Sequence, residues 1–79
     1  MREVSTRYYV ENQGIHNNAG ESLEREYVQL QIDGDTIHTY TLAEFHAIED
    51  ELVIWNHLAA LGFDIDTLSE NIAHDPFIP

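Results

Sequence analysis

The chain has 79 residues, 43% of them hydrophobic, which is enough for one core, and we expect a single domain over residues 1–79. Fifteen acidic residues against three basic ones give a formal charge of -12, which argues against direct binding to nucleic acid or to an anionic membrane. The absence of cysteine excludes disulfides and thiolate chemistry, and no apolar run is long enough to span a bilayer, so we expect a cytoplasmic protein.

The first part of the chain predicts a strand followed by a loop. Residues 3–11 alternate between two faces, as a strand with one buried side does. Residues 12–22 contain two glycines and three asparagines with no period, and predict a long, mobile loop. On the predicted strand, one face carries Val4, Thr6, Tyr8 and Val10.

Alternation resumes over residues 23–32, which predict a second strand with Val28, Leu30 and Ile32 toward the core. Asp33-Gly34 follows at once and predicts a tight hairpin turn, because a type I′ turn needs positive φ at both central positions. A two-residue loop sets the register of a third, antiparallel strand. It pairs Ile32 with Asp35, Leu30 with Ile37, and Val28 with Thr39.

A long helix is predicted next, over residues 42–61. Thr41 and Glu44 have the spacing of a capping box at its start, and Gly62 is a natural end. A stripe at helical spacing should lie across the sheet, with Trp55 at or near the core and Leu52→Ala costing about 2–5 kcal/mol. The stripe consists of Phe45, Ile48, Leu52, Trp55 and Ala59.

After the long helix, Asp64 is a candidate N-cap for a short final helix that ends before Pro76, with Phe63 placed to pack on Leu68. The predicted fold is therefore α+β: a three-stranded antiparallel sheet, in the order β-β-β-α-α, packed against one long helix and a short C-terminal helix. A second apolar row on the long helix exceeds what the last helix can cover, and predicts a homodimer interface. That row is Ala47, Ile54, Leu58 and Leu61.

The sequence carries no pattern typical of a catalytic site. No serine has a glycine elbow, and no phosphate-binding loop is present. His46, Asp50 and His57 share one helical stripe, but at 1.5 Å rise per residue Asp50 and His57 are about 10 Å apart, which leaves at most a two-ligand surface site from His46 and Asp50. We therefore predict no enzyme activity, no metal and no cofactor.

Acidic residues form three rows that predict the partner-binding surface. Carboxylates at regular intervals on rigid elements can imitate the phosphates of a nucleic acid and occupy a channel lined with lysine and arginine. The predicted partner is therefore a protein with a basic surface, such as a nucleic-acid-binding complex. The rows are Glu24 with Glu26, Asp33 with Asp35, and Glu49, Asp50 and Glu51.

In size, charge and lack of catalytic residues, the chain is similar to the small acidic inhibitors that phages and mobile elements encode, including anti-CRISPR proteins and other DNA mimics. The similarity is one of type and assigns no residue a role. Two alternatives remain open. The first is an adaptor or antitoxin-like module that binds through Tyr27 and Tyr40, with Tyr8 or Tyr9 and His38 beside them on an exposed sheet face. The second is a small metal-dependent enzyme, which requires the histidines to converge.

Overall fold

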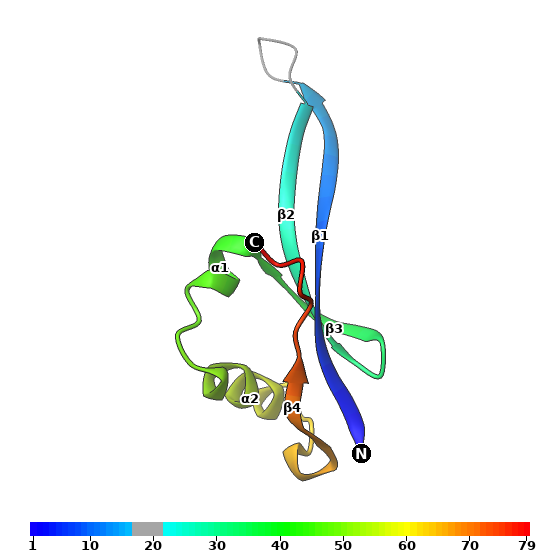
Figure 1. Cartoon of the computed structure of the whole chain (residues 1–79), viewed down its shortest axis with the longest axis vertical. Helices are drawn as coiled ribbons and strands as arrows, with labels where there is room; N and C mark the ends of the chain where they lie inside the picture. Colours follow the sequence, from blue (N-terminus) through cyan, green and yellow to red (C-terminus); the bar gives the residue numbers. More distant parts are fainter. Residues whose placement is uncertain (17–21) are drawn as a thin grey trace.

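The computed structural model describes residues 1–16 and 22–79, and these form an α+β fold around a mixed four-stranded sheet (Figure 1). The strand order is β3-β2-β1-β4, in which β1–β2 and β2–β3 are antiparallel and β4 is parallel to β1. The α+β class is confirmed, whereas the three-stranded, wholly antiparallel sheet is wrong. The elements are β1 (Arg2–His16), β2 (Ser22–Ile32), β3 (Asp35–Thr41), α1 (Leu42–His46), α2 (Glu51–Ala60), a 3-10 turn η1 (Ile65–Thr67) and β4 (Leu68–Ala73).

The core lies between one face of the sheet and α2. Val4, Leu30 and Ile32 are fully buried, and they join Ile54 and Leu58 of α2 in one cluster. The predicted alternation of both strands is confirmed, because Val4 pairs with Ile32 and the even-numbered positions of β1 and β2 then face the same side.

The hairpin turn between β2 and β3 forms where the sequence places it. Asp33 and Gly34 have φ values of 51° and 85°, and Ile32 pairs with Asp35. Beyond the turn the predicted pairing is wrong. Gln31 pairs with Thr36 and Leu30 with His38, so Ile37 is an extra residue on β3.

This bulge moves the rest of β3 by one position, which turns alternate side chains to the other face. Val28 therefore pairs with Tyr40, and not with Thr39 as predicted. Tyr40 lies on the helix-covered face with 7% of its surface exposed. The prediction that Tyr40 and His38 lie on an exposed outer face is wrong for this reason.

The predicted long helix is two helices. The capping box of Thr41 and Glu44 is confirmed, but α1 ends at His46, and Asp50 begins α2 by accepting a hydrogen bond from the Leu52 N–H. The break lets α2 orient independently of α1, so its buried face is set by Ile54 and Leu58, four residues apart.

The break also changes which apolar residues of the two predicted rows are buried. Ile54 and Leu58 are 2% and 0% exposed, so their predicted place in a dimer interface is wrong, while Leu52, assigned to the core, is 58% exposed. Trp55 is half-buried and packs against the core, as predicted. Ala47 and Leu61 are exposed, and the homodimer stays a prediction without the surface that motivated it.

The predicted C-terminal helix is also wrong. Asp64 caps a single 3-10 turn, and the chain then continues as β4. Leu68 and Ile72 are both buried, and their separation of four residues places them on one face in a helix and in a strand alike. This ambiguity explains why the helical interpretation failed.

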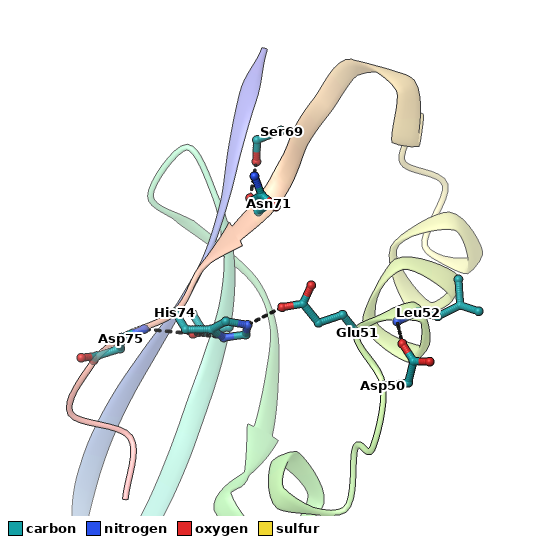
Figure 2. A network of polar contacts seen from close by, with 8 residues as sticks. Asp50, Glu51, Leu52, Ser69, Asn71, His74 and Asp75 are labelled. Atoms are coloured by element: carbon teal, nitrogen blue, oxygen red, sulfur yellow. Dashed lines mark hydrogen bonds and ion pairs between the residues drawn. The ribbon is translucent and has the colours of Figure 1, made fainter.

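The pairing of β4 with β1 is irregular, because Arg2 pairs with Leu68 but Val4 pairs with Ile72. Ser69 fills the irregularity: its Oγ accepts a hydrogen bond from the Val4 N–H at 3.1 Å and donates one to the Asn71 carbonyl at 2.9 Å (Figure 2).

The hairpin of β1 and β2 projects beyond the helices as a two-stranded arm (Figure 1). Residues 12–16 of the predicted loop belong to β1, and residues 17–21 lie outside the described residues. Within the described ranges, no helix has the length and apolar character needed to cross a membrane.

Candidate acidic binding surface

Carboxylates dominate the surface. Apart from half-buried Asp75, every acidic residue in ranges 1–16 and 22–79 is exposed. Across those ranges Arg2 forms an ion pair with Asp33, and His74 contacts Glu51, which makes an ion pair only when His74 is protonated. Most of the carboxylates therefore form no ion pair with the residues that the structure describes.

The row of Glu24 and Glu26 lies on the arm. Both lie an even number of residues from Val28, and the pairing of β2 with β1 is regular between them. Their side chains therefore face the side of the sheet that carries the helices. The Tyr8 hydroxyl donates to Glu26 Oε2 at 2.7 Å, and this hydrogen bond raises the pKa of Tyr8. A hollow of about 340 Å³ is lined by residues 24–27 of β2, Arg25 included, and by Thr41 and the start of α1.

The row of Glu49, Asp50 and Glu51 lies at the corner between α1 and α2, not along one helix. Two of its members have structural contacts: Asp50 caps α2, and Glu51 Oε1 lies 2.9 Å from His74 Nε2 (Figure 2). Glu49 is exposed and has no such contact within the described part of the chain. It is therefore the member best placed to meet a partner.

His74 connects this corner to the sheet. Its Nδ1 lies 3.1 Å from Oγ1 of Thr6, a buried hydroxyl that accepts a hydrogen bond from the Asp75 N–H. Because the carboxylate of Glu51 can only accept, the proton lies on Nε2 in the neutral ring, and Nδ1 accepts from Thr6. The contact between α2 and the segment after β4 is thus fixed by one histidine.

The row of Asp33 and Asp35 is at the β2–β3 turn, away from both helices (Figure 1). Asp33 accepts from the Glu3 N–H at 2.9 Å and pairs with Arg2 at 3.2 Å. These contacts, the backbone hydrogen bond first, lower the pKa of Asp33. The structure therefore groups two of the three predicted rows on the helix side of the sheet and separates the third.

The opposite face of the sheet, which the helices leave uncovered, has a different character. Tyr9 and Tyr27 stack there with ring centroids 5.3 Å apart. Arg7 and Arg25 have the same odd parity on β1 and β2, so two of the three basic residues lie on this face. The sequence analysis missed this separation of charge, although the parity of each arginine relative to Val4 and Val28 was enough to reveal it.

Tyr40 takes part in a buried aromatic cluster instead of the predicted exposed surface. Its hydroxyl is 2.8 Å from His57 Nδ1, and the rings of His38 and His57 meet edge to face at 4.3 Å. Burial raises the pKa of Tyr40. Only Tyr27, with Tyr9, remains for the predicted tyrosine surface.

His46 contacts the last residue: its Nε2 lies 2.6 Å from the Pro79 carbonyl oxygen. No three histidine, aspartate or glutamate side chains converge as metal ligands among residues 1–16 and 22–79. Comparisons with protein-family models, curated proteins and solved structures give no significant match.

Proposed function

We propose that this protein is a non-catalytic acidic binding protein whose helix side occupies a basic surface of another protein, as an inhibitor or nucleic-acid mimic acting on a nucleic-acid-binding complex. One observation carries the proposal. The exposed carboxylates Glu24, Glu26 and Glu49 belong to the helix side, while Arg7 and Arg25 lie on the opposite face. Arg2 has the parity of Val4 and belongs to the helix side as well, but it is paired with Asp33, so the charge that remains on this side is negative and steers association with a cationic partner.

The placement of Glu24 and Glu26 on a strand also supports the proposal. Alternate residues on a strand are about 6.6 Å apart, which sets the spacing of Glu24 and Glu26 along β2, and the Tyr8 hydroxyl holds the carboxylate of Glu26. Fixed carboxylates lose little conformational freedom when they bind, which favours short, charge-assisted hydrogen bonds to arginine and lysine.

Affinity capture with charge-matched variants tests the proposal. One variant removes three helix-side charges, by Glu24→Gln, Glu26→Gln and Glu49→Gln. The control removes three charges elsewhere, by Glu3→Gln, Glu11→Gln and Asp35→Asn. We expect the wild type and the control to retain nucleic-acid-binding proteins from a cell lysate. Retention should be weak for the helix-side variant. For the wild type and the control, retention should decline when salt or duplex DNA is added.

Capture that is indifferent to salt, to DNA and to both sets of substitutions contradicts the acidic mimic. It would instead favour an adaptor that binds through the uncovered sheet face, for which the stacked pair of Tyr9 and Tyr27 is the specific observation. Tyr9→Ser with Tyr27→Ser would then abolish capture.

A further inference from the structure

A groove of about 450 Å³ lies between α2 and the segment of η1 and β4. These elements lie at the opposite end of the molecule from the arm (Figure 1). Its apolar lining comes from Leu52 and Trp55 of α2, Ile65 of η1, Leu68 of β4 and the exposed Met1. The volume is within the range of pockets that hold small ligands or single side chains. Because three different elements build it, the groove is a consequence of the fold and not of one amphipathic helix.

The apolar surface of the groove is only partly covered. Leu52 is 58% exposed, and Trp55 packs against the core yet keeps part of its surface open. An exposed leucine beside a half-buried tryptophan is unfavourable in water and becomes favourable when a partner covers it. Tryptophan is also the residue type most enriched among those that dominate binding energy.

Carboxylates stand at the rim of this groove. Asp66 and Glu70 line it, both are exposed, and neither forms an ion pair with the described residues. Lysine or arginine beside an inserted apolar group would neutralise them. A second copy of this chain suits the site poorly, because it brings a charge of -12 and few cations to an acidic rim.

We propose that this groove takes a large apolar side chain of a partner segment that has lysine or arginine on both sides of it. The inference rests on the proposed function for the basic nature of the partner. It adds an apolar anchor, which charge alone does not supply. Charge steers the encounter, and burial of the anchor against Trp55 selects one basic segment over another.

Trp55 is the only tryptophan of the chain, so its fluorescence reports on the groove directly. The probes are three synthetic peptides with blocked termini: Lys-Lys-Leu-Lys-Lys, Lys-Lys-Ser-Lys-Lys and Glu-Glu-Leu-Glu-Glu. We expect the first to shift the Trp55 emission to shorter wavelength with saturation, the second to bind at least about tenfold more weakly, and the third not to bind.

Adjacent residues of α2 supply a matched pair of variants. Leu52 and Val53 are 58% and 50% exposed, but only Leu52 lines the groove. Leu52→Ser should weaken the leucine peptide at least about fivefold and Val53→Ser should not. Asp66→Asn with Glu70→Gln should weaken both lysine peptides. Circular dichroism and urea unfolding confirm that each variant is folded.

Equal affinity for the leucine and serine peptides overturns the inference, and leaves the acidic surface as a binder by charge alone. Equal loss from Leu52→Ser and Val53→Ser overturns it too. Light scattering of the free protein tests whether a second copy of the chain occupies the groove. A particle of twice 9.1 kDa that Leu52→Ser dissociates shows that the groove is a dimer interface and contradicts the inference. If the leucine peptide binds as expected while the helix-side variant still captures the same proteins, the inference stands and the proposed function fails.

Discussion

Two leucines of α2 have environments opposite to those that the sequence predicted. Leu58 is fully buried, and Leu52 is 58% exposed. We expect Leu58→Ala to lower the free energy of unfolding by about 2–5 kcal/mol, because it leaves a cavity in the core, and Leu52→Ala to lower it by less than about 1 kcal/mol. Urea unfolding followed by circular dichroism measures both. Similar losses at the two positions would contradict the orientation of α2.

His38 makes stability depend on pH. Burial and the nearby His57 lower its pKa, while Glu44 of α1 acts in the opposite direction. Tyr40 also contacts the ring of His38, but its own pKa is raised, so it does not titrate near neutral pH. Because a depressed histidine pKa means that the unfolded chain binds more protons, the stability from neutral His38 is present above about pH 6.5 and is lost as the pH falls below it.

We therefore expect the urea midpoint to fall between pH 7.5 and 5.5, and to fall less in His38→Gln, which has no proton to gain. Carboxylates contribute in a lower window. Backbone hydrogen bonds lower the pKa values of Glu44 and Asp75, so their contribution is present above about pH 4 and is lost below it. Two outcomes would show that His38 is not the titrating group. The first is a wild-type urea midpoint that is constant from pH 7.5 to 5.5, and the second is a midpoint of His38→Gln that falls as much as that of the wild type.

At the scale of elements, the break between α1 and α2 depends on Asp50. Its carboxylate accepts the Leu52 N–H at 2.9 Å and satisfies a backbone donor at the start of α2. Asp50→Ala should lower the free energy of unfolding by about 1 kcal/mol, whereas Asp50→Asn should keep most of the stability, because asparagine is an equally good cap. The comparison is again made by urea unfolding. Equal losses from alanine and asparagine would mean that capping is not the reason for the break.

The elements that local chemistry determines could be predicted from the sequence. Asp33-Gly34 fixed the turn and Thr41 with Glu44 fixed the cap, because each depends on residues close in the chain. The bulge at Ile37 could not be predicted, since either register leaves apolar residues on the buried face, and packing of Tyr40 against α1 and α2 decides between them. Leu68 and Ile72 fit a helix and a strand equally, and only pairing with Val4 of β1 resolves them.

At the scale of the whole molecule, the candidate surface was partly predictable. The acidic rows follow from composition, and their exposure was expected. Which rows share a side depends on where the turn between β2 and β3 lies relative to the helices, and tertiary structure alone decides that. The groove could not be predicted at all, because the continuous helix assumed from the sequence buries Leu52 against the sheet.

The parallel pairing of β4 with β1 has a kinetic consequence. Val4 and Ser69 are 65 residues apart in the chain, while the turn at Asp33 brings β2 and β3 together locally. Closing a loop of that length costs entropy before any contact repays it, so β4 should dock after the barrier to folding has been crossed. Weakening β4 would then accelerate unfolding and leave the folding rate almost unchanged. The lifetime of the native state, more than the speed of reaching it, is therefore set by the last strand.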